Sequence, residues 1–404
     1  MDDGELVVGG LRAAALADEF GTPIVVYCRD TVLARARAYA RVDPDMLVAY
    51  GTKAFPNVAL LQLLAAEGLG ADVSTLGELE FARRAGIDGE RLIFHGNNKS
   101  NEELRAAAEA GATVVLDSLD EIARARTAGV STVLVRLTPE IEADTHHAIR
   151  TAHAESKFGL VADDAIAAVR EARASGLDAA GLHVHIGSQL MRTSESLLAV
   201  ERLVGVAEHC RDELAWTPRV FNLGGGLGIR YTLEDAVPEP DEFAGELVRH
   251  LRARWTEAAQ LILEPGRSLV GPAGFTLYRV GQIKRTAGVA YAAVDGGMSD
   301  NPRPQLYGSR YEAILANRAG EPAAGSFRIA GKHCESGDVL IDGVELPEPQ
   351  PGDLLAVPAT GAYTLAMASN YNGVPRPAAV LVGDGSAELI RRRETLDDLL
   401  AFEP

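Results

Sequence analysis

Cysteine is scarce in this sequence of 404 residues, and the three that occur are Cys28, Cys210 and Cys334. They form no C-x-x-C pair, and an odd number of scattered thiols is not typical of a disulfide framework. The composition therefore fits a reducing compartment. Each cysteine taken alone is best interpreted as a small buried side chain.

Long apolar runs are also missing. No stretch is long enough to cross a bilayer. The first ten residues, MDDGELVVGG, lack the basic region and the apolar core of a signal peptide. We therefore expect a cytoplasmic protein that does not associate with membranes.

Positive charge is in deficit. The sequence has 39 Lys and Arg residues but 57 Asp and Glu residues, which gives a net charge of −18. Such a surface repels DNA and RNA, so a nucleic-acid partner is disfavoured. The sequence also lacks an internal repeat beyond the alternation described next, and it has no low-complexity segment.

Short apolar segments alternate with Ala-rich amphipathic segments from about residue 45 to residue 270, preceded by a helix over 30–42. Eight such alternations favour a (β/α)8 TIM barrel over an open sheet. No G-x-G-x-x-G follows the first strand, which weakens a dinucleotide-binding fold. The expected strands span 47–50, 70–74, 91–95, 113–117, 132–137, 178–185, 220–223 and 261–263. The expected helices between them span 57–67, 76–85, 101–110, 119–128, 162–175, 194–214 and 241–259.

The pattern changes after about residue 272, where strand-like segments are punctuated by Gly and Pro. We expect strands over 275–283, 289–294, 326–330, 353–357 and 378–382, and a helix over 396–402. A strand pattern over 22–27 lies outside the eightfold count and is expected to pair with this part. The fold class is therefore α/β, with a barrel domain over 29–271 and an all-β sandwich or barrel formed by 1–28 plus 272–404.

Polar residues gather directly after the expected barrel strands, at the face where barrel active sites lie. Lys53, in YGTKAF, follows the first strand. Alone it is most simply a surface lysine, but a partly desolvated lysine at a barrel mouth could form a Schiff base. The other residues of this kind are Ser74, His95, Asp117, His185, Gly224 and Glu264.

Two further motifs follow the seventh and eighth strands. In LGGGLG, Gly224, Gly225 and Gly226 lack a Cβ that would shield backbone N–H groups from an anion, which favours phosphate binding over a merely flexible turn. In EPGR, Glu264 could pair with a protonated pyridine nitrogen. Its alternative is a surface ion pair with Arg267, which would contribute little.

His183 and His185 lie in GLHVHIGSQ. Their spacing invites a metal-site interpretation, yet no third ligand is evident beside them. The alternatives are core histidines, or an imidazole stacked on a flat cofactor with Ser188 donating to its phosphate. We therefore predict no metal. The last motif, CESGD, starts at Cys334 and taken alone is a polar loop.

Taken together, these motifs occur in one order, and the chain resembles the pyridoxal 5′-phosphate (PLP) decarboxylases of fold type III, most closely the diaminopimelate decarboxylases. The resemblance covers nearly the whole length. The motifs that carry it are YGTKAF, HGNNKS, THHAIRTAHAESKFG, GLHVHIGSQ, NLGGGLGIRY, EPGRSLVGPAG, DGGMSDNPRPQLYGSRY, GKHCESGDVL and GAYTLAMASNYNGVPRP. The family usually has Thr-Gly where this chain has Thr151-Ala152-His153.

The resemblance implies PLP as cofactor and assigns a role to each matching residue. Lys53 would hold PLP covalently, His185 would stack on its ring, and Glu264 would meet the pyridine nitrogen. The implied phosphate cradle is Ser188 with Gly224, Gly225 and Gly226, and the same motifs place Gly266, Arg267 and Tyr363 at the cofactor. The implied substrate contacts are Arg267, Arg303, Tyr307, Glu335 and Tyr363, and Cys334 would help to protonate the product.

The activity implied is decarboxylation of meso-2,6-diaminopimelate to L-lysine and CO2, in lysine biosynthesis. Cys334 and Glu335 would enter the site from the other subunit of a homodimer. Three alternatives stay open: a decarboxylase of D-lysine, D-ornithine or another diamino acid, an amino-acid racemase, and a non-catalytic PLP-binding module. Glu264 disfavours the racemase, and the additional β-rich domain disfavours the binding module.

Overall fold

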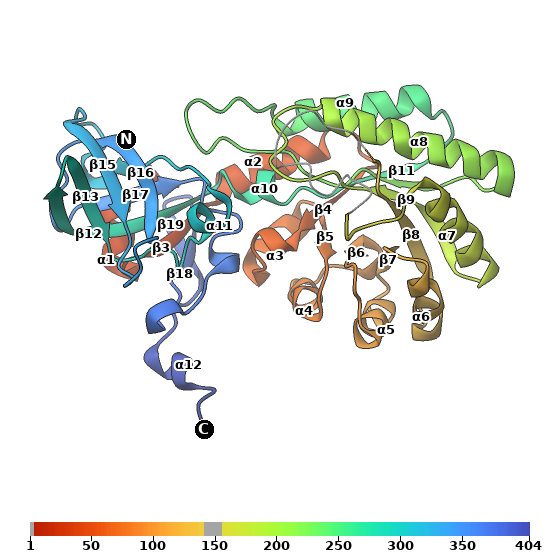
Figure 1. The fold of residues 1–404 in the computed structure, drawn as a ribbon, viewed down its shortest axis with the longest axis horizontal. Coiled ribbons are helices and arrows are strands. Elements are labelled where there is room, and N and C mark those ends of the chain that lie inside the picture. The colour runs from red at the N-terminus through yellow and green to blue at the C-terminus, as the bar shows by residue number, and fades with distance from the viewer. Residues whose placement is uncertain (1–3, 141–155) are drawn as a thin grey trace. The chain divides into compact units, whose positions relative to one another are not determined.

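A computed structural model describes residues 4–140 and 156–404 (Figure 1). Most of the THHAIRTAHAESKFG motif, including Thr151-Ala152-His153, lies outside the described residues. The chain divides into two compact units. One comprises Leu33–Gly228 and Ala236–Ser268, and the other comprises Met1–Val32, Ile229–Asp235 and Leu269–Pro404.

The first unit contains a closed barrel of eight parallel strands in the order β10-β11-β4-β5-β6-β7-β8-β9. The predicted barrel is thereby confirmed, and each strand lies within about one residue of its expected position. Because all strands run in one direction, their carboxyl ends meet at one face. The strands are β4 (Leu47–Gly51), β5 (Gly70–Val73), β6 (Leu92–Phe94), β7 (Thr113–Leu116), β8 (Thr132–Leu137), β9 (Asp178–Val184), β10 (Val220–Asn222) and β11 (Gln260–Leu263).

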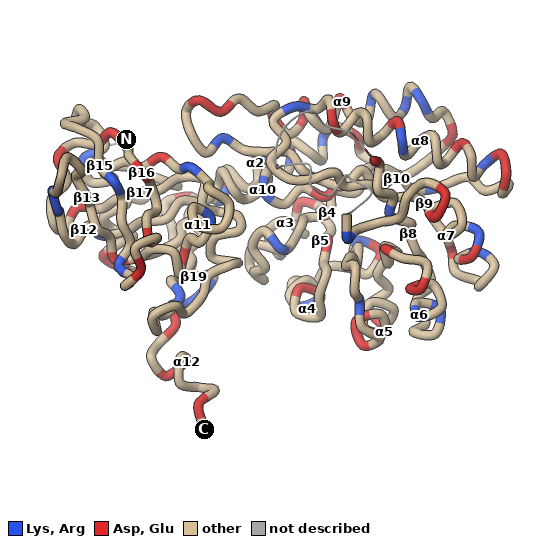
Figure 2. Tube along the Cα trace, in the orientation of Figure 1, with Lys and Arg blue, Asp and Glu red and all other residues tan. Residues whose placement is uncertain are grey.

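Helices surround the barrel, and basic and acidic residues alternate along several of them (Figure 2). Three successive helices begin at a capping side chain that accepts a backbone N–H: Asn57 for α3, Thr75 for α4 and Ser100 for α5. Such caps fix where a helix starts after a loop. The helices are α2 (Arg29–Ala40), α3 (Val58–Ala66), α4 (Leu76–Arg84), α5 (Asn101–Glu109), α6 (Asp120–Ala128), α7 (Ala162–Ala174), α8 (Ser194–Leu214), α9 (Pro240–Arg254) and α10 (Arg267–Val270).

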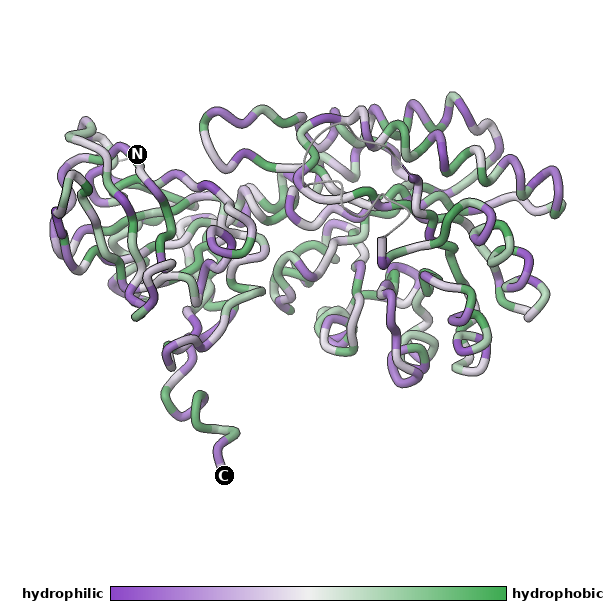
Figure 3. Tube along the Cα trace, in the orientation of Figure 1, coloured by the Kyte–Doolittle hydropathy of each residue, from purple (hydrophilic) through white to green (hydrophobic). Residues whose placement is uncertain are grey.

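Apolar residues concentrate in the barrel strands (Figure 3). Inside the barrel, small and branched side chains from six strands form one buried cluster. Its members are Ala49, Ile93, Val115, Leu134, Ala180 and Ile262. Parallel strands covered on both faces are expected to be apolar throughout, which explains why their sequences do not alternate.

The second unit is a mixed sheet of nine strands, which confirms the predicted β-rich domain. Its central strand β12 pairs with β3 in an antiparallel arrangement, and β3 pairs with β18, so the expected pairing of the N-terminal strand is confirmed. The sheet strands are β3 (Ile24–Cys28), β12 (Gly274–Thr286), β13 (Val289–Val294), β14 (Ile314–Leu315), β15 (Gly325–Ala330), β16 (Val339–Leu346), β17 (Leu354–Pro358), β18 (Ala378–Gly383) and β19 (Ser386–Arg391). The remaining elements are a hairpin of β1 (Val7–Val8) and β2 (Leu11–Arg12), and the helices α1 (Ala13–Phe20), α11 (Arg303–Tyr307) and α12 (Leu396–Leu400).

The segment Ile229–Asp235 falls inside the sequence range of the predicted barrel but packs with the β unit. Its Ile229 and Tyr231 belong to the buried core of that unit. Among residues 4–140 and 156–404, none of the helices combines the length and the apolar character that a membrane span requires.

Candidate active site

A pocket of about 250 Å3 opens at the carboxyl-terminal face of the barrel. Its walls come from the ends of the strands and the loops after them, as expected for a barrel enzyme. Lys53 lies in the short helix Thr52–Ala54 directly after β4, and its side chain is exposed at the pocket. The lining residues are Lys53, Asp72, Ser74, Glu78, His95, Gly96, Arg136, Phe158, His183, His185 and Glu264.

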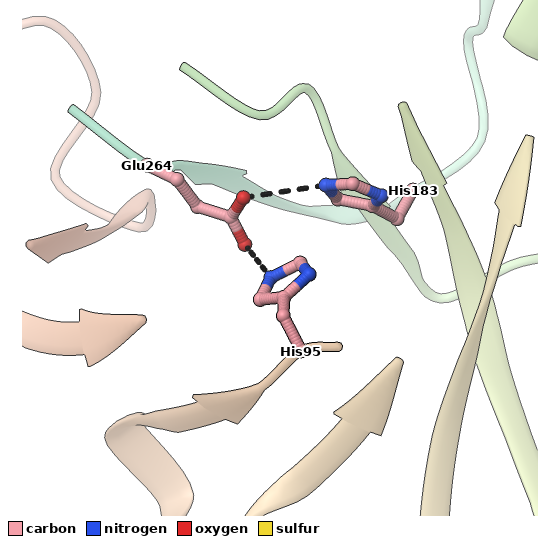
Figure 4. Close-up of side chains that lie close together, drawn as sticks. All are labelled: His95, His183 and Glu264. Carbon is pink, nitrogen blue, oxygen red and sulfur yellow. Dashed lines mark hydrogen bonds and ion pairs between the residues drawn. The ribbon is translucent and has the colours of Figure 1, made fainter. Parts of the chain in front are cut away.

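Glu264 is a buried lining residue of this pocket, and His95 and His183 point at its carboxylate (Figure 4). Its Oε1 accepts hydrogen bonds from His95 Nε2 at 2.7 Å and from the side-chain amide of Asn222, and its Oε2 accepts from His183 Nε2 at 3.2 Å. A carboxylate has about four lone-pair positions. Three donors from the described residues therefore leave room at Oε2 for one more donor.

The histidines keep Glu264 ionised. Burial alone would raise its pKa, but His95 and His183 oppose that effect and hold the pKa of Glu264 well below its usual range. Burial also lowers the pKa of His183 to about 4, so this imidazole is neutral at pH 7 and donates its Nε2 proton. The pocket thus holds a fixed carboxylate without a permanent positive charge on His183.

The same three residues could be considered as metal ligands, because their ligating atoms lie within 4.8 Å of one another. However, Nε2 of each histidine points at the carboxylate of Glu264 at hydrogen-bond distance. A metal site formed by both histidines of the H-x-H motif is not supported, since His185 lies outside this cluster and its Nδ1 accepts the N–H of Gly225 at 3.2 Å.

Two further acidic side chains that line the pocket, Asp72 and Glu78, were not predicted from the sequence. Burial raises the pKa of Asp72 to about 6, although His95 and Lys53 oppose this effect. Glu78 accepts hydrogen bonds from the backbone N–H and the hydroxyl of Ser74, at 2.7 and 2.9 Å. Asp72 interrupts an otherwise apolar strand, β5, and that anomaly is the signal that could have revealed it.

Arg136 was also not predicted from the sequence, and it lies within the otherwise apolar strand β8. Its guanidinium lies over the ring of Phe158, at 4.6 Å from the centroid, and 3.5 Å from Asp117. The predicted site residue Asp117 therefore supports Arg136 instead of lining the pocket. Behind it, Glu121 accepts the N–H of Asp117 and pairs with the fully buried ammonium of Lys99 at 2.7 Å.

The glycine turn after β10 packs against neighbouring strand ends. A Cβ added at Gly224, Gly225 or Gly226 would come within 3.0 Å of backbone oxygens of Val184, Glu264 or Gly187, respectively. The N–H of Gly224 donates to Asn222 Oδ1 at 2.9 Å. These glycines are therefore required by close packing, in addition to any role toward an anion.

In the barrel unit, Arg267 donates from Nη2 to the hydroxyl of Ser188 at 2.9 Å. Burial lowers the pKa of His185 well below its usual value, and the positive charges of Lys53 and Arg136 lower this pKa further. His185 is therefore a neutral, flat side chain. A donor pair, a flat imidazole, a lysine and an ionised carboxylate with a remaining acceptor position are the groups that a phosphorylated pyridine aldehyde requires.

The other predicted site residues lie in the β unit. The guanidinium of Arg303 is buried among aromatic rings, at 5.3 Å from the centroid of Tyr307, 5.5 Å from Tyr231 and 5.9 Å from Tyr363. Its Nε donates to the hydroxyl of Tyr311 at 3.1 Å. The structure thus brings Arg303, Tyr307 and Tyr363 together.

Cys334 and Glu335 are exposed neighbours on the loop before β16. The N–H of Cys334 donates to Asn372 Oδ1 at 3.0 Å, and Glu335 Oε2 accepts from the hydroxyl of Tyr371 at 3.4 Å. Tyr371 was not predicted as a site residue, although it lies in the GAYTLAMASNYNGVPRP motif.

A larger hollow of about 540 Å3 lies on the β unit. Its charged side chains include Arg328 and Asp342, which already form an ion pair and leave little unsatisfied charge for a ligand. The barrel pocket, with its perturbed carboxyls, is the better candidate.

Comparison with known proteins agrees with this geometry. Residues 29–271 match the family described as the pyridoxal binding domain of pyridoxal-dependent decarboxylases. The chain therefore belongs to the pyridoxal-dependent decarboxylases.

Within that class, it belongs to the diaminopimelate decarboxylase family. The chain is 44% identical to the diaminopimelate decarboxylase of Bacillus subtilis (strain 168), over 99% of this chain and 95% of the relative. The crystal structure of the M. jannaschii diaminopimelate decarboxylase in complex with L-lysine is 32% identical, with a TM-score of 0.94, and covers 100% of this chain and 97% of that one. The Helicobacter pylori diaminopimelate decarboxylase, also complexed with L-lysine, is 30% identical with a TM-score of 0.89, over 96% of this chain and 98% of that one.

Proposed function

We propose that this protein decarboxylates meso-2,6-diaminopimelate to L-lysine and CO2 with PLP as cofactor. The observation that carries the proposal is the ionised Glu264, which lines the same pocket as Lys53 and His185. The full-length similarity to diaminopimelate decarboxylases supports the choice of substrate.

PLP, when bound, supplies an electron-accepting ring that stabilises the negative charge left by the departing carboxylate. We assign Lys53 to hold the cofactor covalently and His185 to stack on its ring. The carboxylate of Glu264 would accept a hydrogen bond from the protonated pyridine nitrogen. The phosphate would be bound by Ser188, Gly224, Gly225 and Gly226. Gly266, Arg267 and Tyr363 would be further cofactor contacts.

The substrate contacts that we propose are Arg267, Arg303, Tyr307, Glu335 and Tyr363. Arg303 and Arg267 suit a substrate that carries two carboxylates, and Glu335 suits a distal ammonium. A buried charge without a partner is costly, so these pairs would reject diamino acids with a single carboxylate. Cys334 would donate the proton that replaces CO2.

We infer a homodimer in which Cys334 and Glu335 of one subunit complete the site of the other. Both residues are exposed in the single chain, as are the neighbouring Tyr371 and the large side chains of Leu306 and Tyr307. A second subunit would cover this surface. We also infer a cytoplasmic location, because Cys28, Cys210 and Cys334 are all free thiols.

Product analysis tests the proposal. The purified protein with PLP should release CO2 and L-lysine from meso-2,6-diaminopimelate, and it should turn over D-lysine and D-ornithine much more slowly. Faster release of CO2 from D-lysine or D-ornithine would assign it to another diamino-acid decarboxylase. Racemisation without CO2 release would contradict decarboxylation altogether.

A further inference from the structure

Asp338 is a buried carboxylate in the β unit that has no part in the chemistry proposed above. It is 3% exposed. Its Oδ1 accepts the N–H of Met298 at 2.7 Å, and its Oδ2 accepts the N–H of His333 at 2.9 Å. The side chain therefore joins two loops, 295–301 and 331–338, through charge-assisted hydrogen bonds, which are stronger than neutral ones.

Backbone encloses this carboxylate on two sides. A Cβ added at Gly297 or at Gly331 would come within 3.0 Å of the carboxylate oxygens of Asp338. Within the loop itself, the N–H of Gly331 donates to the carbonyl of Asp338 at 2.9 Å, and the N–H of Asp338 donates to the carbonyl of Glu335 at 3.1 Å. Asp338 thus closes the loop 331–338 and fastens it to its neighbour.

A second carboxylate supports the first. Asp300 accepts the hydroxyl of Tyr278 on one oxygen and the N–H of Gly297 on the other, at 2.8 Å for the latter. Ser299 contacts Nε2 of His333 at 2.9 Å. The loop 295–301 is therefore itself held rigid where Asp338 binds it.

The loop that Asp338 closes carries Cys334 and Glu335 at its exposed turn. The far end of this turn is held by Gln305, whose amide donates to the carbonyl oxygens of Gly337 at 3.0 Å and Val339 at 2.9 Å. The backbone of the turn is thus fixed at both ends, while its two reactive side chains face outward.

We propose that Asp338 is a positioning residue, whose carboxylate holds the loop 331–338 in the conformation that presents Cys334 and Glu335. The proposal rests on the proposed function for the roles of those two side chains. Asp338 itself touches neither substrate nor cofactor.

The first test uses the thiol of Cys334 as a reporter that does not depend on catalysis. Holoenzyme carrying Asp338→Asn keeps the shape of the side chain but removes its charge and one of its acceptor oxygens. Alkylation of Cys334 by iodoacetamide, followed by peptide mass spectrometry, should become several-fold faster, because the loop samples more open conformations. The rates at Cys28 and Cys210 should stay the same.

The control is Asp342→Asn, because Asp342 lies on β16 in the same unit and its side chain is 74% exposed. This variant should match the wild type in alkylation and in turnover. In contrast, Asp338→Asn should lower kcat/KM for meso-2,6-diaminopimelate by about 100-fold, the loss that a displacement of about 1 Å can cause. If all three thiols react faster in Asp338→Asn, its role is merely structural and the proposal is overturned.

Binding of L-lysine separates positioning from general destabilisation. Asp338→Asn and Glu335→Gln should each weaken L-lysine binding to the holoenzyme about tenfold, as when a charge-assisted contact is lost. The double variant should bind no more weakly than Glu335→Gln alone, because coupled residues are non-additive. Multiplied losses would show that Asp338 does not act through Glu335.

Two outcomes remain distinct. A wild-type protein that does not act on meso-2,6-diaminopimelate would refute the proposed function, yet the alkylation assay would still report on Asp338. If Asp338→Asn does not fold, Gln305→Met provides a milder change at the other end of the turn. Unaltered Cys334 alkylation together with unaltered L-lysine affinity in that variant would overturn the proposal.

Discussion

Replacement of Glu264 by glutamine separates the proposed electronic role of this side chain from its structural role. The carboxylate accepts hydrogen bonds from His95, His183 and Asn222. In the variant, the glutamine oxygen can still accept from His95 and Asn222, while its amide nitrogen would face Nε2 of His183. Nδ1 of His183 has no hydrogen-bond partner among the described residues, so the ring can move its proton to Nδ1 and accept from the amide instead.

The expected loss of stability is therefore small. Each charge-assisted hydrogen bond to Glu264 becomes a neutral one, which lowers stability by about 1 kcal/mol at most. The variant also no longer buries a charge, and the free-energy cost of that burial is removed. We expect the free energy of unfolding of Glu264→Gln to fall by about 1–2 kcal/mol. By contrast, Glu264→Ala would leave three buried donors without an acceptor, at about 1–3 kcal/mol each.

The catalytic loss should exceed the structural one. A neutral amide cannot keep the pyridine nitrogen protonated, so the stabilisation of developing charge falls by about 3 kcal/mol, or about 100-fold in kcat. The assay combines CO2 release, PLP content and urea unfolding. The control is Glu201→Gln, because Glu201 also lies beside a histidine, with its Oε1 2.6 Å from Nε2 of His250, but it belongs to α8 on the outside of the barrel unit. A fully PLP-loaded Glu264→Gln enzyme with kcat within about threefold of the wild type would refute the assignment of Glu264 to the pyridine nitrogen.

Three further predictions follow from the same structure. Lys53→Ala should abolish the visible absorbance of covalently bound PLP and the release of CO2, and retention of that absorbance would show that another amine holds the cofactor. Burial raises the pKa of Asp300 to about 7, whereas its value in the unfolded chain is about 4. Between these two pH values the unfolded chain releases this proton and the folded protein keeps it, so the free energy of unfolding falls as pH rises, by up to ~4 kcal/mol. The melting temperature of Asp300→Asn should lack that part of the pH dependence. Equal pH profiles of the melting temperature for the wild type and the variant would contradict this assignment to Asp300. Lys99→Met should lower the free energy of unfolding by about 3–5 kcal/mol because it leaves Glu121 buried and unpaired, whereas Lys99→Met/Glu121→Leu should recover part of the loss in urea titrations.

The sequence predicted the barrel strands closely because each is a short, mostly apolar run that precedes a helical pattern, and the helices α3, α4 and α5 begin at a capping side chain. It failed where tertiary packing decides the outcome. The helix expected over 241–259 ends at Arg254, because Trp255 leaves the helical path and packs its buried ring against Phe221 at 5.3 Å. The strand β16 was not predicted, since Asp342-Gly343 resembles a turn. The structure accommodates it with a register shift, and Gly343 has a φ of +105°.

Other missed elements have equally local causes. The strand β19 lies at an edge, and none of its residues is fully buried, so it shows little apolar patterning. The helix α11 starts directly after Pro302 and has only five residues, too few for helical periodicity. In the pocket, the motifs pointed to Lys53 and Glu264, whereas no motif contained Asp72 or Arg136. A charged residue inside an apolar strand is an anomaly in the sequence, but its role becomes clear only when its neighbours in the closed barrel are known.

The glycine turn shows that the sequence offered an incomplete reason for a glycine. The sequence suggested that Gly225 is glycine to expose backbone N–H groups to an anion. In the structure, a Cβ at this position would overlap the carbonyl oxygen of Glu264, and the N–H of Gly225 donates to His185. If anion binding were the only requirement, Gly225→Ala would weaken PLP affinity and leave the stability of the apoprotein unchanged. Close packing instead predicts that Gly225→Ala destabilises the apoprotein by about 1–3 kcal/mol, the cost of overpacking a filled site, and displaces Glu264 as well. Urea unfolding of the apoprotein distinguishes the two explanations, because no phosphate is present to contribute, and an unchanged midpoint would show that the strand ends can move apart.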